Sequence, residues 1–208
     1  METEFLKDQS APIEVIVLNG ASSSGKTTLS AALQEVLHES WLVFGVDTLI
    51  SALPLNLLTI HDDATIVARP KDHAVREGGI TFDAEGEVTV GGEYQRLETA
   101  WRAALSTIVE SGVRLILDEV FLDGARSQDR LRESLMGRRV AWIGVTCDDD
   151  VALEREANRG DRVVGMYERQ ARRVHDGVSY DLVVDTTSRP SLEVARQIAE
   201  RLGLVMPL

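Results

Sequence analysis

The sequence predicts an α/β fold in which a doubly wound, mainly parallel sheet is flanked by helices. Two observations support this prediction: short hydrophobic runs alternate with segments of helical periodicity, and the runs are nearly continuous. Strands that helices cover on both faces have such continuous runs. The predicted strands lie at 13–18, 41–46, 113–117, 140–145 and 182–184.

The length favours one domain. A chain of 208 residues, 44% of them hydrophobic, can bury one continuous core. We expect a flexible leader at 1–12 and a single domain at 13–208. Helical patterns separate the predicted strands; one follows the first strand, and others lie at 93–110, 149–158 and 192–202.

The segment 55–92 breaks this alternation and predicts an insertion or flap over the edge of the sheet. Loops longer than about 15 residues usually have a function or are disordered. Within the segment, alternating hydrophobic residues around a polar turn at 83–86 predict a small hairpin; they are Ile80, Phe82, Val88 and Val90.

The composition argues against a nucleic-acid or membrane partner. The net charge of −12 repels a polyphosphate backbone. No hydrophobic run approaches the roughly 20 residues that a membrane-spanning helix needs, and the first residues lack the pattern of a secretory signal. We therefore expect a cytoplasmic protein; the sequence leaves a homo-oligomer open.

A phosphate-binding loop follows the first predicted strand and opens a predicted helix. Residues 20–27 fit the pattern G-x-x-x-x-G-K-[ST], which is the P-loop, and they lie in the strand–loop–helix context that this motif requires. Backbone N–H groups of such a loop converge on phosphates at a helix N-terminus. We expect nucleotide contacts from Gly20, Ala21, Ser22, Ser23, Ser24, Gly25, Lys26, Thr27 and Thr28.

This loop predicts ATP with Mg²⁺ as the bound nucleotide. The Lys26 ammonium is expected to bridge the β- and γ-phosphates and so to act in phosphoryl transfer, and the Thr27 hydroxyl to be an oxygen ligand of Mg²⁺. The motif alone does not distinguish hydrolysis, transfer and switching.

Three carboxylates follow predicted strands, where α/β sheets bind ligands. Asp118 is expected to support Mg²⁺ through water, with a turn cap as the alternative; the role of Glu119 stays open. Asp47 suits a base that orients an acceptor hydroxyl and takes its proton late. The alternative for Asp47 is an N-cap of the next helix.

Arginines recur at helical spacing in the predicted lid region, 155–175. Arg155, Arg159 and Arg162 surround Gly160, where the chain could bend. Guanidinium groups suit a transferring phosphate, and we expect Arg159 and Arg162 to serve it. A solvated face of paired charges is the alternative.

The chain resembles chloramphenicol phosphotransferase and related small P-loop kinases over most of its length. The resemblance rests on many segments in the same order. They are Ile16-Val17-Leu18-Asn19-Gly20, Phe44-Gly45-Val46-Asp47, 79–83, Leu117-Asp118-Glu119-Val120-Phe121-Leu122, 145–148, Arg159-Gly160-Asp161-Arg162-Val163, 174–175 and Val184-Asp185-Thr186-Thr187.

This resemblance implies ATP-dependent phosphorylation of a primary alcohol on a small molecule. It implies Asp47 as the catalytic base, Arg159 and Arg162 as lid arginines, and adenine near the carboxy-terminal loop. Residues 61–75 look inserted relative to the family, beside the expected acceptor pocket. That difference puts chloramphenicol as the acceptor, and with it antibiotic resistance, in question.

Two other functions fit the same loop. A nucleotide-dependent switch would bind GTP or ATP and change conformation, although the chain has no Asn-Lys-x-Asp guanine signature. A toxin-like kinase of a nucleotide sugar would share the loop, the base and the arginines. A screen of hydroxylated acceptors distinguishes the three.

Overall fold

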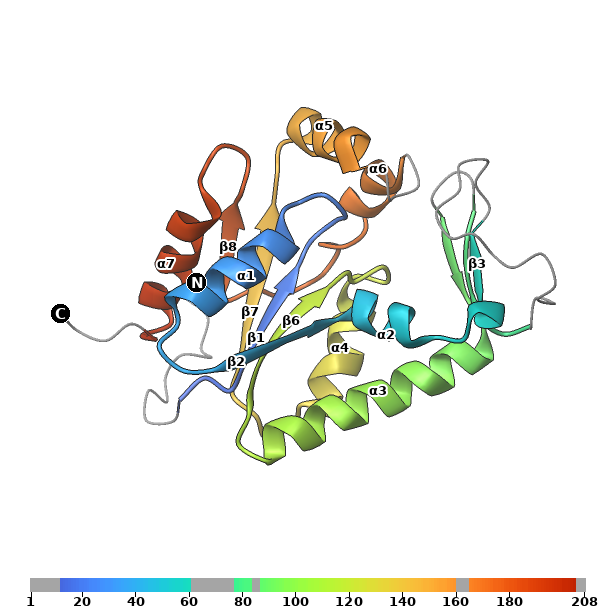
Figure 1. Ribbon diagram of the computed structural model, residues 1–208, viewed down its shortest axis with the longest axis horizontal. Coiled ribbons are helices and arrows are strands. Elements are labelled where there is room, and N and C mark those ends of the chain that lie inside the picture. The colour runs from blue at the N-terminus through green and yellow to red at the C-terminus, as the bar shows by residue number, and fades with distance from the viewer. Residues whose placement is uncertain (1–11, 61–76, 84–86, 160–164, 205–208) are drawn as a thin grey trace.

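The computed structural model describes residues 12–60, 77–83, 87–159 and 165–204 (Figure 1). The central strands are β1 (Val15–Asn19), β2 (Trp41–Gly45), β6 (Arg114–Glu119), β7 (Val140–Thr146) and β8 (Leu182–Asp185). A smaller sheet has β3 (Leu58–Ile60), β4 (Ile80–Phe82) and β5 (Val88–Val90). The helices are α1 (Lys26–Val36), α2 (Val46–Ala52), η2 (Leu55–Leu57), α3 (Gly92–Glu110), α4 (Ala125–Ser134), α5 (Asp149–Arg159), α6 (Met166–Ala171) and α7 (Ser191–Arg201).

The central sheet has the order β2-β6-β1-β7-β8, and each neighbouring pair is parallel. This confirms the predicted doubly wound α/β fold. β1 lies in the middle, so the loop that follows it opens at the centre of the carboxyl edge. The register pairs Asn19 with Glu119 and Gly45 with Asp118. The polar residues at the ends of β1, β2 and β6 therefore meet at one edge, where doubly wound sheets bind ligands.

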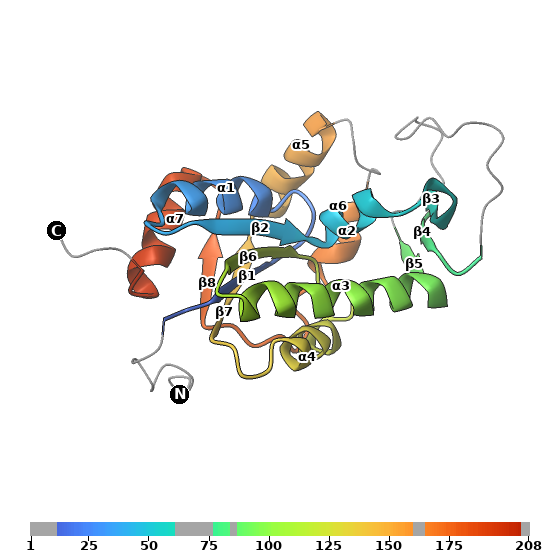
Figure 2. The same cartoon turned by 60° about the horizontal axis from the view of Figure 1, so that its bottom comes forward.

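Helices cover both faces of this sheet (Figure 2). α1 and α7 pack together on one face, where Leu29, Leu33, Val194 and Ile198 are buried. α3 and α4 cover the other face, with Leu105, Val109, Leu131 and Leu135 buried there. Since the inner strands β1, β6 and β7 are largely buried on both faces, their runs are continuous in hydrophobicity, as the sequence indicated.

The smaller sheet confirms the predicted hairpin and adds a strand to it. β4 and β5 are antiparallel, with Ile80 opposite Val90, and β3 pairs with β4 in parallel. This sheet lies beside the N-terminal end of α3 (Figure 1). Ile80 and Tyr94 are buried there with Leu49 and Leu53 of the α2 region, so α2, the small sheet and the start of α3 form one hydrophobic unit.

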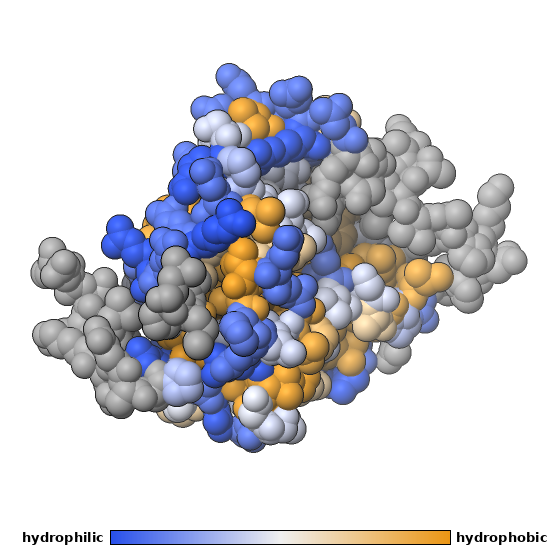
Figure 3. Space-filling view, turned by 60° about the vertical axis from the view of Figure 1, so that its left-hand side comes forward, coloured by the Kyte–Doolittle hydropathy of each residue, from blue (hydrophilic) through white to orange (hydrophobic). Residues whose placement is uncertain are grey.

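Residues 61–75, the expected insertion, lie outside the described part of the chain, as does most of the expected leader, 1–12. Among the described residues, no helix is long and apolar enough to cross a bilayer. Figure 3 shows one face of the molecule, on which hydrophobic side chains gather in a band between hydrophilic regions.

Candidate active site

The phosphate-binding loop lies between β1 and α1, as predicted, and its backbone has little freedom. Gly20 packs against the carbonyl oxygen of Val145, so that any Cβ at this position would overlap it. Gly25 has a φ of 88° immediately before α1, and Ser23 has a φ of 59°. Left-handed backbone is easy for glycine and costly for most other residues, so the motif glycines determine the shape of the loop.

The loop contains polar groups that the described residues do not satisfy. The hydroxyls of Ser22, Ser23 and Ser24 are buried and lack a hydrogen-bond partner in the described part of the chain. Buried polar groups without partners cost free energy and are uncommon. An anion at the N-terminus of α1 would satisfy such donors, so the loop fits a phosphate chain.

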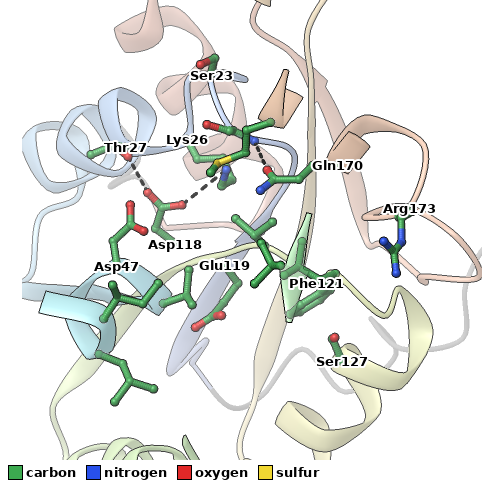
Figure 4. Close-up of a pocket in the computed structure, with 18 of the residues that line it drawn as sticks. Ser23, Lys26, Thr27, Asp47, Asp118, Glu119, Phe121, Ser127, Gln170 and Arg173 are labelled. Atoms are coloured by element: carbon green, nitrogen blue, oxygen red, sulfur yellow. Dashed lines mark hydrogen bonds and ion pairs between the residues drawn. The ribbon is translucent and has the colours of Figure 1, made fainter. Parts of the chain in front are cut away.

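Lys26, Thr27 and Asp118 converge at the start of α1 (Figure 4). The Thr27 hydroxyl donates to Oδ2 of Asp118 at 2.8 Å. The Lys26 ammonium donates to the carbonyl oxygen of Ala21 at 2.9 Å and lies 3.8 Å from Oδ1 of Asp118. A hydroxyl and a carboxylate side by side are oxygen donors of the kind that Mg²⁺ takes, usually together with phosphate oxygens and water. These residues fit that ion.

Other elements hold the loop in place. The side-chain oxygen of Gln170, on α6, accepts a hydrogen bond from the Ser22 N–H at 2.6 Å. The Thr186 hydroxyl, just after β8, donates to the Ser24 carbonyl oxygen at 2.6 Å. The Arg155 guanidinium donates to the Thr186 carbonyl oxygen at 2.8 Å. The carboxy-terminal loop is thereby joined to the phosphate loop.

Asn19 links the loop to two further segments. Its side chain, 1% exposed, donates to the Val174 carbonyl oxygen at 2.7 Å and to the Tyr180 hydroxyl at 2.5 Å, and it accepts from the Phe121 N–H at 2.9 Å. The same Tyr180 hydroxyl lies 2.7 Å from Nδ1 of His175. Its O–H can donate a hydrogen bond to Nδ1 when the imidazole is neutral and carries its proton on Nε2. Burial and the Lys26 charge lower the pKa of His175, which favours that neutral form.

A cavity of about 670 Å³ extends from the phosphate loop to the small sheet. At its phosphate end it is lined by loop and α1 residues, with Arg155, Asn158 and Arg189 nearby. Its other end has a hydrophobic wall of residues from α2, the small sheet and α3, namely Leu49, Ile50, Ile80, Phe82, Val88, Val90 and Trp101. The cavity is large enough for two ligands end to end, since pockets of ordinary ligands begin near 300 Å³.

Asp47 also lines this cavity. It lies in the first turn of α2, whose N-cap is Gly45, so the N-cap alternative for Asp47 is wrong. Gly45 packs directly on the Asp118 carbonyl oxygen, where a larger residue would not fit. In Figure 4 the Asp47 carboxylate points toward Asp118 and Thr27. A hydroxyl bound there would lie next to the phosphate end.

Glu119 has a different environment from its neighbour Asp118. Its side chain points away from Asp118 and Thr27 in Figure 4. Burial is the main cause that raises the pKa of Glu119 to about 8, with contributions from the charges of Asp118 and Glu98, while Arg102 and Lys26 act in the opposite direction. This raised pKa favours the protonated carboxyl group at neutral pH.

The first turns of α3 bring further polar groups to the cavity. Tyr94, Glu98, Trp101 and Arg102 all line it. The Arg102 guanidinium pairs with Glu98 at 3.1 Å. Burial raises the pKa of Tyr94, and the nearby charges of Glu98 and Glu119 raise it further, so its hydroxyl keeps its proton. Sequence analysis predicted the helix but not these site residues.

The predicted lid arginines are only partly described. Arg159 is the last residue of α5, and the structure describes its backbone but not its side chain; Arg162 lies outside the described residues. Other arginines line the cavity from this side, among them Arg169 and Arg173. Arg173 donates to Oε1 of Glu87, which precedes β5, at 2.6 Å. That ion pair connects the lid side to the small sheet.

Sequence analysis missed the supporting residues Gln170 and Asn19. Gln170 lies on a helix of 6 residues, too short to show a periodic pattern. Asn19 did give a signal, because it is a polar residue at the end of a hydrophobic strand and directly before the motif.

A family model and a relative that match this chain are both described as phosphotransferases. The family model described as "chloramphenicol phosphotransferase-like protein" matches residues 13–203. A protein of Mycobacterium tuberculosis, provisionally named an O-phosphotransferase, is 33% identical over 193 residues, covering 90% of this chain and 81% of that protein.

Solved structures show the fold. An unliganded sugar kinase of Janibacter superposes with a TM-score of 0.60 at 17% identity, covering 93% of this chain and 96% of that one. The tunicamycin resistance protein of Deinococcus radiodurans has a TM-score of 0.60 at 20% identity, covering 95% of this chain and 100% of that one. These likenesses are to the P-loop kinase fold.

Proposed function

Because this chain belongs to the chloramphenicol phosphotransferase-like family and is a phosphotransferase with a hydroxyl acceptor, we propose that it transfers the γ-phosphate of Mg²⁺-ATP to an alcohol group of a small molecule. The observation that carries this proposal is the convergence of Lys26, Thr27 and Asp118 beside Asp47 in one cavity. Donor and acceptor sites are thereby continuous, as direct transfer requires.

The phosphate end binds and orients the donor. The serine hydroxyls and backbone N–H groups of the loop would bind the phosphates, and the Lys26 charge would lie against the β- and γ-phosphates. The Thr27 hydroxyl would hold Mg²⁺ directly, with Asp118 behind it through water; the ion neutralises phosphate charge when bound. Adenine is assigned to the region of Arg155 and Thr186, which lies at the same end of the cavity.

Asp47 is the proposed base. Phosphoryl transfer has a loose transition state, so the carboxylate chiefly orients the acceptor hydroxyl and takes its proton late. Its place in the first turn of α2, pointing toward Asp118 and Thr27, supports this role. Arg159 and Arg162 are proposed to stabilise the transferred charge, as the family resemblance implies.

The acceptor is proposed to lie against the small sheet and α3. Its wall is mostly hydrophobic, and polar groups lie at its base. An amphipathic alcohol such as chloramphenicol matches that distribution, with its reactive hydroxyl at Asp47. The insertion at 61–75 adjoins β3 in sequence, so the preferred acceptor of this chain can differ from chloramphenicol.

Two variants test the proposal. Lys26→Ala should abolish transfer and weaken nucleotide binding measured by calorimetry. Asp47→Asn should leave nucleotide affinity within about twofold while lowering kcat for transfer by at least about a hundredfold, the usual range for loss of a general base.

The assay incubates the chain with ATP, Mg²⁺ and a panel of hydroxylated antibiotics, sugars and nucleosides, and detects added phosphate by mass. Arg159→Ala should lower kcat more than it lowers nucleotide affinity. Full activity of Asp47→Asn would eliminate it as the base. Nucleotide hydrolysis with no phosphorylated acceptor anywhere in the panel would favour a switch instead.

A further inference from the structure

Three arginines line one side of the cavity, between α4, α6 and the small sheet. Arg130 lies on α4, Arg169 in the last turn of α6, and Arg173 shortly after α6. The whole chain has 34 acidic and only 22 basic residues, yet the cavity lining has seven Lys or Arg against six Asp or Glu. Basic side chains are therefore concentrated at the cavity of an acidic protein.

Backbone contacts fix the place of these arginines across the cavity from the proposed base. The Ala125 N–H, at the start of α4, donates to the Asp176 carbonyl oxygen at 2.9 Å, which holds the chain after α6 against the N-terminal end of α4. Figure 4 shows Ser127 of α4 and Arg173 on the opposite side of the pocket from Asp47. A ligand that reaches Asp47 can therefore extend to this side.

Two of the arginines are oriented by carboxylates and keep further donors. Arg173 donates to Glu87 at 2.6 Å, and Arg130 donates to Asp123 at 2.9 Å. Each of these ion pairs uses one nitrogen of the guanidinium, and a guanidinium has five N–H groups. Exposed ion pairs contribute little to stability, so we expect that these pairs chiefly orient the guanidinium groups toward a ligand.

Arg169 and Ser127 add donors to the same side. Within the described ranges, Arg169 has no ion-pair partner, and it lines the cavity. The Ser127 oxygen accepts from the Asp123 N–H at 3.2 Å and from Arg130 at 3.1 Å, so its own proton remains for a ligand. Three guanidinium groups here face the carboxylates of Asp123 and Glu87, which leaves a net positive charge. Guanidinium groups are well suited to bind carboxylates and phosphates.

We propose that Arg130, Arg169 and Arg173 form a subsite for an anionic group, and that the acceptor is an alcohol carrying a carboxylate or phosphate across the cavity from its reactive hydroxyl. The inference rests on the proposed kinase function for the fate of the hydroxyl. Carboxylate and phosphate share the anionic oxygens that these donors bind. The donor nucleotide is assigned to Lys26 and the phosphate loop, so the two anionic ligands use separate cations.

The test compares benzyl alcohol with two relatives that carry an acid group in the para position, hydroxymethylbenzoate and hydroxymethylphenyl phosphate. Dissociation constants are measured by ligand-observed NMR with Mg²⁺ and a non-hydrolysable ATP analogue, which occupies the phosphate loop. A hydrogen bond to a charged group corresponds to about tenfold or more in affinity. The wild type should therefore bind at least one acid about tenfold more tightly than benzyl alcohol, and the tighter acid identifies the anionic group.

The subsite variant combines Arg130→Gln, Arg169→Gln and Arg173→Gln, which removes the charges and keeps polar side chains. It should bring the affinity ratio of acid to benzyl alcohol close to one without weakening benzyl alcohol. Arg169→Gln alone breaks no ion pair of the described residues, so it tests the subsite without disturbing other contacts. It should lower the ratio by about threefold or more, since one of three charges is lost.

The matched control has the same change in net charge outside the cavity. It replaces three exposed arginines that do not line the cavity by glutamine, namely Arg126, Arg172 and Arg196. This control should keep the wild-type ratio. Circular dichroism checks that both triple variants are folded.

A wild-type ratio near one, or no measurable binding of either acid, overturns the inference. An unchanged ratio in the subsite variant or in Arg169→Gln does so too, because the acid would then bind elsewhere. An equal loss in the control would assign the effect to net charge alone. Phosphate transfer is followed by mass in parallel: selective binding of an acid with no phosphorylated alcohol would count against the kinase function only, whereas equally efficient transfer to benzyl alcohol and the acids would count against the subsite only.

Discussion

Replacing Asn19 by alanine should lower the free energy of unfolding far more than removing an exposed amide side chain would. The side chain connects the end of β1 to the segments after β6 and after α6, through the Phe121 N–H and the Val174 carbonyl oxygen. Phe121 and Val174 are 2% and 0% exposed, so water reaches the abandoned groups poorly.

The magnitude follows from those two groups. A buried donor or acceptor left unsatisfied costs about 1–3 kcal/mol. Two such groups give an expected loss of about 2–6 kcal/mol in the free energy of unfolding, a large share of the stability of an ordinary domain. Nucleotide affinity should fall as well, because Gly20 follows Asn19 directly.

Urea unfolding followed by circular dichroism measures this loss, and Tyr180→Phe provides the graded comparison. That variant removes only the hydroxyl, so it should cost about 1 kcal/mol. If Asn19→Ala cost no more than Tyr180→Phe, the idea that Asn19 supports the loop through its backbone partners would be refuted.

Three further predictions concern the loop and its surroundings. Gly20→Ala should abolish nucleotide binding, measured by calorimetry, because the added methyl group would overlap the Val145 carbonyl oxygen. Gly92→Ala is the control and should bind nucleotide normally, because a methyl group there meets nothing within 4 Å. Normal binding by both variants would show that the loop can adapt to a side chain at position 20. Thr27→Val should raise the Mg²⁺ concentration for half-maximal transfer by about tenfold or more, with Thr27→Ser near wild type, and an unchanged Mg²⁺ requirement would eliminate Thr27 as a ligand. The folded-state pKa of His175 is below its ordinary value, so the unfolded chain takes up the proton first and stability is lost as the pH falls below about 6.5; His175→Gln should lose less stability between about pH 7 and pH 5 in urea titrations, and equal losses would contradict this account.

The features that sequence analysis predicted well are local. Strands buried on both faces are continuous hydrophobic runs, and the phosphate loop is one contiguous motif whose glycines fix its backbone. The helix α4 was missed because it is mostly polar, with Leu131 as its deeply buried aliphatic residue. The six-residue helix α6 was missed because it spans less than two turns.

The proposed acceptor end of the cavity could not be predicted because tertiary packing assembles it. Tyr94 lies on a helix that the pattern predicted, but nothing in that pattern tells which of its residues meet the small sheet. Likewise, Glu119 is next to a residue with an expected role, yet its opposite orientation depends on the alternation of side chains along β6. Asp47, by contrast, could be proposed because a strand end is a local signal.

The separation of the two sheets has a consequence for protein engineering. The residues proposed to bind the donor belong to the central sheet and its helices, whereas the hydrophobic wall comes from α2, β4, β5 and α3. Randomising exposed or half-buried wall positions such as Val88 and Val90 should therefore change which alcohol is accepted. The residues proposed to bind the nucleotide would stay unchanged. A library of variants confined to these two short strands could be screened for enzymes that phosphorylate other drugs or sugars. Such substitutions should disturb folding little, because the central sheet is left unchanged.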